Sequence, residues 1–318
     1  MHEDQLDVSV ETVRALVADQ LPAWRDLAVR LLPQSGTVNA IARLGDALAA
    51  RFPLRPGRPE EVRRVLELEA AAGRRLVGRL RVPFPEPVTI GAPGRGYPLS
   101  WSVQTWVPGA DAFAVDPGGS AAFARDLAAL VVDLRAVPTG GRTFVGERRT
   151  NRGGRIADHD GWVQTCLERS VGLLDVATLA RRWASLRRLP RGPEPDTTTH
   201  GDLVPGNVLV AGTGSGARLA GLLDVGGTGA ADPALDLVGA WHLLDDGPRT
   251  VFREALGVGD ASWARGTAWA FEQAIGLVWY YRATNPLLSA QGRRTLARIL
   301  RASPAALPVP PSSAPTNR

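Results

Sequence analysis

The first hundred residues combine two stretches of helical apolar spacing with several short runs that suit β-strands. Residues 9–24 predict a helix for which Ser9 or Thr12 is available as the N-cap, and residues 60–80 predict a second helix entered through Pro59. The strand-like runs lie at Leu27–Leu31, at 41–52 with a turn at Leu44-Gly45-Asp46, at 87–90 and at 100–107. Together these elements predict a small, β-rich N-terminal lobe.

The pattern changes at the break formed by Pro108 and Gly109, after which helical spacing predominates. The predicted helices cover residues 120–137, 159–174, 176–188, 234–244, 249–256, 260–282 and 290–302, and the one exception is a short hairpin at 208–224. We therefore expect an α+β protein of two lobes, residues 1–108 and 109–302, with a cleft between them. Residues 303–318 are rich in proline and serine, which is typical of a disordered tail.

The predicted hairpin places two polar side chains at one of its ends. The apolar runs 208–210 and 219–223 are separated by a glycine-rich loop, and folding the chain about that loop brings Asn207 opposite the end of the second strand. Asp224 follows that strand directly. A carboxylate and an amide oxygen held side by side are hard ligands that suit Mg²⁺.

A third polar side chain precedes the hairpin. Asp202 lies five residues before Asn207, and the turn predicted at Pro205-Gly206 brings its carboxylate back over the same place. A carboxylate beside a metal-bound phosphate is able to orient an attacking hydroxyl group and accept its proton. The set of Asp202, Asn207 and Asp224 therefore predicts phosphoryl transfer.

Composition and charge exclude several other classes of protein. Lysine and arginine number 37, and every one of them is arginine. The isoelectric point of 10.4 reflects arginine, which never titrates near neutral pH, whereas the net charge is only +5 and no basic run is long. We therefore expect no nucleic-acid partner. The single Cys166 excludes an internal disulfide, and the absence of an apolar run or leader of the required length predicts a cytoplasmic protein without a membrane partner.

The motifs HGDLVPGN at 200–207 and LLDVGGTGAADPALDL at 222–237 resemble the aminoglycoside phosphotransferase family, relatives of the protein kinases. Further segments resemble the family in the same order, namely 35–52, 60–70, 83–88, 101–110, 152–160, 263–271 and 280–286. The resemblance extends over about residues 10–300. It implies a protein-kinase-like fold and the use of ATP or GTP together with Mg²⁺.

The resemblance implies a role for each residue that matches a family motif. Asp202 matches the catalytic base, and Asn207 and Asp224 match the Mg²⁺ ligands. The turn Ser35-Gly36-Thr37 matches the loop that closes over the nucleotide phosphates, where small residues and backbone N–H groups suit phosphate oxygens. The backbone groups of Thr105 and Val107, in the stretch that matches the hinge, match those that meet the adenine edge.

The sequence departs from the family pattern at the phosphate anchor. The family usually has a lysine there, and this chain has Arg51, which is able to hold phosphate oxygens bidentately but with a different reach. Its expected partner is Glu69 on the predicted helix, with Glu67 as the alternative. A second departure is Val225, which replaces the usual aromatic residue after Asp224 at a position expected to pack rather than react.

Several other residues admit both a structural and a functional interpretation. We expect His200 to hold its loop by hydrogen bonds and Asp236 to cap or brace the same loop. The aromatic residues Trp263, Trp269, Trp279, Tyr280 and Tyr281 lie at helical spacing, which favours core packing, with an acceptor pocket as the alternative. Asp158 and Asp160 are candidate acceptor contacts.

The sequence as a whole predicts a Mg²⁺-dependent small-molecule kinase. Its expected acceptor is a hydroxyl group of an aminoglycoside, of a macrolide or nucleoside-type antibiotic, or of a related metabolite, which makes antibiotic resistance one expected role. Residues 139–199 contain 11 arginines against 7 acidic residues, and residues 245–318 contain 9 against 5, which disfavours a polycation. The alternative is a catalytically silent nucleotide-binding module, which the missing lysine favours and Asp202 disfavours. A protein kinase is less favoured because no activation segment follows Asp224. The acceptor and the oligomeric state are left open.

Overall fold

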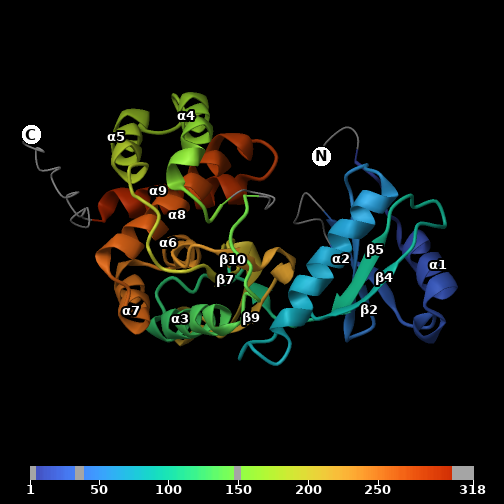
Figure 1. The fold of residues 1–318 in the computed structure, drawn as a ribbon. Coiled ribbons are helices and arrows are strands. Elements are labelled where there is room, and N and C mark those ends of the chain that lie inside the picture. The colour runs from blue at the N-terminus through green and yellow to red at the C-terminus, as the bar shows by residue number, and fades with distance from the viewer. Residues whose placement is uncertain (1–4, 33–38, 147–151, 303–318) are drawn as a thin grey trace, which may run out of the picture.

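The N-terminal part is built on a five-stranded antiparallel sheet (Figure 1). The computed structural model describes residues 5–32, 39–146 and 152–302. Within them the sheet has the order β1-β2-β3-β5-β4 and comprises β1 (Val29–Leu31), β2 (Asn39–Leu44), β3 (Leu48–Pro53), β4 (Pro87–Gly91) and β5 (Trp101–Thr105). The strands agree with the predicted runs. The turn between β2 and β3 contains Gly45, whose φ of 56° lies in the left-handed region that glycine adopts without steric cost.

Side chains alternate between the two faces of this sheet, and each face has its own function in the fold. One face of β2, β3 and β5 is apolar and buries residues such as Ala42, Phe52 and Trp101 in a core closed by the helix α1 (Val10–Gln20). The opposite face carries Arg51 and Ser102, which line a cavity. Because the side-chain period of a strand is two, this alternation decides that Arg51 points into the cavity and not into the core.

Two helices accompany the sheet, and both were predicted. The hydroxyl of Ser9 caps α1 by accepting a hydrogen bond from the backbone N–H of Thr12, 3.1 Å. The second helix, α2 (Pro59–Leu76), begins at the predicted proline and lies on the other side of the sheet from α1 (Figure 1). It ends four residues before the predicted boundary, because the chain turns at Gly78, whose φ is 71°.

The C-terminal part is a helical assembly around the long helix α8 (Asp260–Tyr280), of which residues Trp263 to Ile275 are buried without a break. The other helices are α3 (Ala121–Ala136), α4 (Asp160–Arg169), α5 (Val176–Leu186), α6 (Val238–Leu243), α7 (Asp246–Leu256) and α9 (Pro286–Arg301). Short 3₁₀ turns lie at Pro22–Trp24, Ile156–His159, Pro205–Asn207, Gly214–Gly216, Val225–Gly227 and Leu235–Leu237. All predicted helices are present, and their ends differ by up to five residues. No helix of the described ranges is long and apolar enough to span a membrane.

The prediction of a single hairpin after residue 109 was incomplete. The hairpin strands β8 (Val208–Ala211) and β9 (Arg218–Leu222) are joined by a third strand, β6 (Ala110–Asp111), and a separate two-stranded sheet consists of β7 (Thr197–Thr199) and β10 (Gly229–Ala231). These three additional strands are two or three residues long, too short to show an alternating pattern in the sequence.

The hairpin has the predicted register. Val208 pairs with Leu222, and the N–H of Leu223 donates to the carbonyl of Asn207, 2.8 Å. Asn207 and Asp224 therefore emerge at the same end of the ribbon, as the sequence predicts.

Candidate functional site

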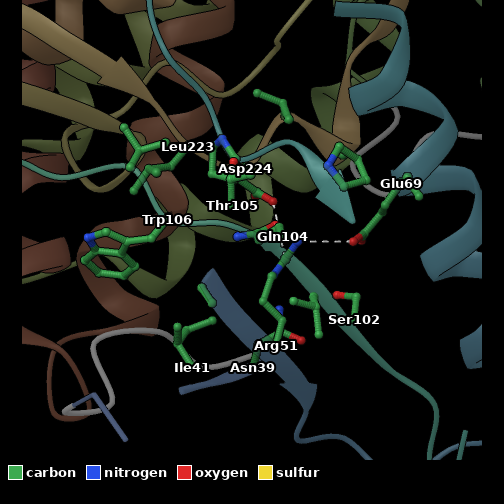
Figure 2. Close-up of a pocket in the computed structure, with 18 of the residues that line it drawn as sticks. Asn39, Ile41, Arg51, Glu69, Ser102, Gln104, Thr105, Trp106, Leu223 and Asp224 are labelled. Atoms are coloured by element: carbon green, nitrogen blue, oxygen red, sulfur yellow. Dashed lines mark hydrogen bonds and ion pairs between the residues drawn. The ribbon is translucent and has the colours of Figure 1, made fainter. Parts of the chain in front are cut away.

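A cavity of about 390 Å³ lies between the five-stranded sheet and the start of the helical part. The sheet contributes side chains of β2, β3 and β5, helix α2 closes one side, and the ends of β8 and β9 close the other. Figure 2 shows Arg51 in this cavity with its guanidinium group between Glu69 and Asp224. The residues expected at the nucleotide site that also line this cavity are Arg51, Glu69, Thr105, Val107, Asn207 and Asp224.

Asp202 and Asn207 lie together, as the turn between them predicts. The 3₁₀ turn at Pro205–Asn207 reverses the chain, and the Asn207 side-chain nitrogen donates to the Asp202 carbonyl, 2.9 Å, and to its carboxylate Oδ2, 3.0 Å. Both contacts use the amide nitrogen. Among the described residues no hydrogen bond uses the amide oxygen of Asn207, which could therefore bind a ligand or a metal.

Asp224 has a backbone conformation that few residues other than glycine adopt. Its φ is 54° and its ψ is 44°, two residues after the end of β9. Aspartate tolerates the left-handed region better than most residues, but the conformation still costs on the order of 1–3 kcal/mol and is concentrated at functional sites. The side chain is about half exposed, 49%, and faces the cavity.

Arg51 connects the two sides of the cavity. Its Nη1 lies 3.4 Å from Oε2 of Glu69 on α2, and its Nη2 lies 3.7 Å from Oδ1 of Asp224. Arg51 thus contacts Glu69, whereas Glu67 is exposed and pairs with Arg63 one turn away on the same helix, 2.9 Å.

Two buried side chains, those of Asp236 and His200, hold the loop that carries Asp202 by hydrogen bonds. Asp236 accepts the backbone N–H groups of His200, 3.0 Å, and of Gly201, 2.7 Å, so it braces the loop as expected. The His200 ring accepts the Asp202 N–H at Nδ1, 3.3 Å, and donates from Nε2 to the Leu223 carbonyl, 2.9 Å. His200 thus links the loop to the residue before Asp224, which is the structural role that the sequence predicts.

An arginine that the sequence reasoning left without a role lies near Asp202. Arg152 donates from Nε to Glu272, 2.5 Å, and His159 contacts the other oxygen of that carboxylate, 3.1 Å. Burial raises the pKa of the Asp202 carboxyl above its ordinary value and the Asp224 carboxylate adds to the rise, whereas the charge of Arg152 opposes it. Burial would also raise the pKa of Glu272, but Arg152 and His159 outweigh it and the pKa lies below its ordinary value.

The end of β5 forms the part of the cavity expected to meet a base. The Thr105 N–H donates to the Glu86 carbonyl, 2.9 Å, and its hydroxyl accepts from the Glu86 N–H, 2.9 Å. The backbone N–H of Thr105 is therefore engaged, and its carbonyl oxygen is the backbone group that a ligand could meet. Val107 is buried and lines the same cavity two residues further on.

Some expected site residues lie elsewhere. Ser35, Gly36 and Thr37 fall outside the described residues, so the expected phosphate loop stays a prediction. Asp160 contacts Trp183, 2.8 Å, and Arg187, 2.5 Å, on α5, so both its oxygens already have partners. The remaining candidates for acceptor contacts divide by exposure: Trp263 and Trp269 are buried, Trp279 and Tyr281 are half-buried, and Asp158 and Tyr280 are exposed.

The side chains present fit a magnesium ion. Asp224 offers a carboxylate and Asn207 an amide oxygen, both of the hard oxygen type that Mg²⁺ prefers, and Mg²⁺ commonly takes its other ligands from water and phosphate. Among the residues that the structure describes, no group of three or more histidine, cysteine, aspartate or glutamate side chains forms a metal site of another kind.

Both the sequence and the fold are similar to those of known proteins. The model of a family described as the phosphotransferase enzyme family matches residues 29–271. The GDP and kanamycin complex of APH(2")-IIia has a TM-score of 0.66 at 20% identity, covering 90% of this chain and 97% of that one. The macrolide 2'-phosphotransferase MphH from Brachybacterium faecium has a TM-score of 0.58 at 20% identity, covering 90% and 98%. The streptomycin-ATP-APH(2")-IIa ternary complex has a TM-score of 0.54 at 15% identity, covering 92% and 97%.

At these identities the structural likeness establishes the fold, which is the predicted kinase-like α+β fold of two parts. A comparison of the sequence with curated proteins finds no match.

Proposed function

The chain belongs to the phosphotransferase enzyme family, and from that premise we propose that it transfers the γ-phosphoryl group of ATP, or of GTP, to a hydroxyl group of a small molecule. The observation that carries the proposal is that Asn207 and Asp224 line one cavity together with Arg51, and that Asn207 donates a hydrogen bond to the Asp202 carboxylate. Solved relatives with bound GDP, ADP and ATP support a nucleotide in that cavity.

Asp202 would orient the acceptor hydroxyl and accept its proton. The hydroxyl oxygen forms a bond to the γ-phosphorus, the bond from that phosphorus to the β–γ bridging oxygen breaks, and the nucleoside diphosphate leaves. The proton of the hydroxyl passes to the Asp202 carboxylate, whose pKa burial raises. A raised pKa makes this carboxylate a better proton acceptor.

The other side chains would hold the nucleotide. Arg51, fixed by Glu69, supplies a permanent positive charge for phosphate oxygens, and the carbonyl of Thr105 and the N–H of Val107 would meet the base. Mg²⁺, held by Asn207 and Asp224, would supply charge that offsets the negative charge on the phosphates when it is bound. Catalysis of this kind rests on positioning and electrostatic stabilisation.

The acceptor class is a hydroxylated small molecule, and the charges near Asp202 favour one that is neutral or weakly charged. Relatives of the same fold include complexes with kanamycin and streptomycin and a macrolide phosphotransferase. In this chain Arg152 lies beside the proposed base, and the acceptor-side segments carry more arginines than acidic residues. A macrolide, a nucleoside-type antibiotic or a related metabolite therefore fits at least as well as a polycationic aminoglycoside.

The test is to incubate the protein with ATP, Mg²⁺ and a panel of hydroxylated antibiotics and metabolites, and to measure acceptor mass together with ADP release. We expect one acceptor to gain one phosphoryl group. The Asp202→Asn variant should lose about 10²–10⁴-fold in turnover while it still binds nucleotide, since a positioned base contributes about that much. Asp26→Asn removes an exposed carboxylate that does not line the cavity and is the matched control, expected to retain wild-type turnover.

Two outcomes would contradict the proposal. Nucleotide binding without transfer to any acceptor would favour the silent module instead. Equal turnover in the Asp202→Asn and Asp26→Asn variants would remove Asp202 from the role of base.

A further inference from the structure

A chain of buried hydrogen bonds runs from helix α9 to the peptide that precedes Asp202. On α8, Gln273 donates from Nε2 to the carbonyl of Gly201, 2.9 Å, and its Oε1 lies 2.9 Å from Nε2 of His242 on α6. The Nδ1 of His242 lies 3.0 Å from the hydroxyl of Thr295 on α9, and Gln291 donates to that hydroxyl, 3.2 Å. We call this series of hydrogen bonds the relay. Its four side chains, those of Gln273, His242, Thr295 and Gln291, are at most 5% exposed.

The chemistry of the groups fixes the direction of every bond in the relay. The Oε1 of Gln273 only accepts, so Nε2 of His242 must carry the proton and donate. Burial lowers the pKa of His242 to about 4, so the ring is neutral near pH 7 and its Nδ1 accepts from the hydroxyl of Thr295. Each acceptor therefore has a donor, and the relay ends as a donated hydrogen bond to the Gly201 carbonyl. A buried polar network of this kind is costly to leave partly unsatisfied.

The last hydrogen bond of the relay restrains Gly201, the residue of the loop with the greatest backbone freedom. Gly201 has a φ of 82°, in the left-handed region, and glycine restrains its own backbone less than any other residue. Its N–H is held by Asp236, 2.7 Å, and its carbonyl by Gln273, 2.9 Å. The two hydrogen bonds fix the peptide planes on either side of Gly201. The plane between Gly201 and Asp202 in turn sets the orientation of the backbone from which the Asp202 side chain projects.

We propose that Gln273 and His242 are positioning residues for the transfer reaction: they fix the peptide between Gly201 and Asp202, and thereby aim the Asp202 carboxylate at the acceptor hydroxyl. This inference rests on the proposed function. Neither residue touches the reacting groups. Gln273 acts through the backbone of the loop, and His242 acts by holding the Gln273 amide in the orientation that presents its N–H₂ group to the loop.

The principal variant is Gln273→Glu, which keeps the size of the side chain and its acceptor for His242 but places a carboxylate oxygen against the Gly201 carbonyl. We expect faster amide hydrogen exchange in a peptide covering residues 198–206, measured on the full chain by mass spectrometry. We also expect kcat with the acceptor found in the panel to fall about 10–100-fold. The Kd for ATP with Mg²⁺ should stay within about twofold, because the relay does not line the cavity.

A second pair of variants keeps the test meaningful if Gln273→Glu folds poorly. His242→Gln retains a side-chain N–H donor toward Gln273 and should retain kcat within about threefold, whereas His242→Leu removes the donor and should lose at least tenfold. Thr267→Val is the matched control. It lies buried on the same helix, and among the described residues its hydroxyl bonds only the Trp263 carbonyl of its own helix, 2.9 Å, so exchange and kcat should match the wild type.

Each result separates this inference from the function on which it rests. Exchange in the loop that is no faster in Gln273→Glu and His242→Leu than in Thr267→Val would overturn the restraint itself, whether or not the protein turns over. Faster exchange with an unchanged kcat would overturn the positioning role. A wild-type protein that transfers phosphate to no acceptor would overturn the proposed function, and with it the positioning role. Hydrogen exchange would in that case still show whether the relay restrains the loop.

Discussion

Replacing Glu69 by glutamine removes one charge from the Arg51–Glu69 ion pair and leaves the shape of the side chain almost unchanged. The pair joins β3 to α2 across the cavity at 3.4 Å, and its side chains are only 16% and 25% exposed. Arg51 then keeps one carboxylate neighbour, Asp224 at 3.7 Å, which the proposed function assigns to the metal. We therefore expect the guanidinium group to leave the position in which it meets the phosphates.

The distance and the burial set the size of the effect. At 3.4 Å and an effective dielectric constant of about 20, the Coulomb energy of the pair is about 5 kcal/mol before desolvation. The cost of burying both charges offsets most of that energy. We expect about 1–2 kcal/mol to remain as lost affinity, which corresponds to an increase of roughly 5–30-fold in the Kd for ATP with Mg²⁺.

The assay is calorimetric titration of nucleotide into the wild type, Glu69→Gln, Arg51→Gln and the double variant. The matched control is Glu67→Gln on the same helix, whose exposed pair with Arg63 is worth less than about 1 kcal/mol. We expect the two site variants to be coupled and the control to bind within about twofold of the wild type. Equal affinities for Glu69→Gln and Glu67→Gln, or fully additive losses in the double variant, would show that the Arg51–Glu69 ion pair does not position Arg51 for the nucleotide.

Three further predictions follow from the same contacts. In Gly226→Ala the added methyl group would lie 2.8 Å from side-chain carbons of Glu69, so we expect nucleotide Kd to rise about tenfold, whereas Gly227→Ala, with open space around it, should bind as the wild type. Asp236→Asn places an amide against two backbone N–H groups and should lower the free energy of unfolding in urea by about 2–3 kcal/mol; a loss under about 0.5 kcal/mol would contradict the bracing role. Burial lowers the pKa of His242 to about 4, so the unfolded chain takes up a proton before the folded chain does as the pH falls. The wild type should therefore lose about 3 kcal/mol of stability between about pH 6.5 and 4, and His242→Gln should not. Parallel pH profiles of the two proteins would contradict this.

Local pattern was sufficient for the parts of the site that lie close together in the sequence. The apolar runs on either side of a glycine-rich loop predict the register that brings Asn207 opposite Leu223. The Pro205-Gly206 turn predicts the return of the chain over Asp202. The resemblance to the family then supplied Arg51 and its partner on α2, which no local pattern distinguishes from other charged pairs.

The parts that depend on distant segments could not be predicted. Strands β7 and β10 have the sequences TTT and GAA, which become strands only because they pair with each other. Gln273 lies 72 residues from the carbonyl it bonds, and no spacing rule connects them. The segment containing Arg152 resembles the family, but its position beside Asp202 is set by Glu272, 120 residues away. A signal was present in Glu272 and Gln273 themselves, since adjacent polar residues in an otherwise apolar helix call for buried partners.

Binding of Mn²⁺ in place of Mg²⁺, measured by electron paramagnetic resonance, tests most directly whether Asn207 and Asp224 form one metal centre. In the presence of ATP we expect one bound Mn²⁺ per chain in the wild type and in Asp202→Asn, and a loss of at least tenfold in Mn²⁺ affinity in Asn207→Ala and Asp224→Ala. Mn²⁺ binding that is unchanged in both of these variants would show that Asn207 and Asp224 do not hold the metal.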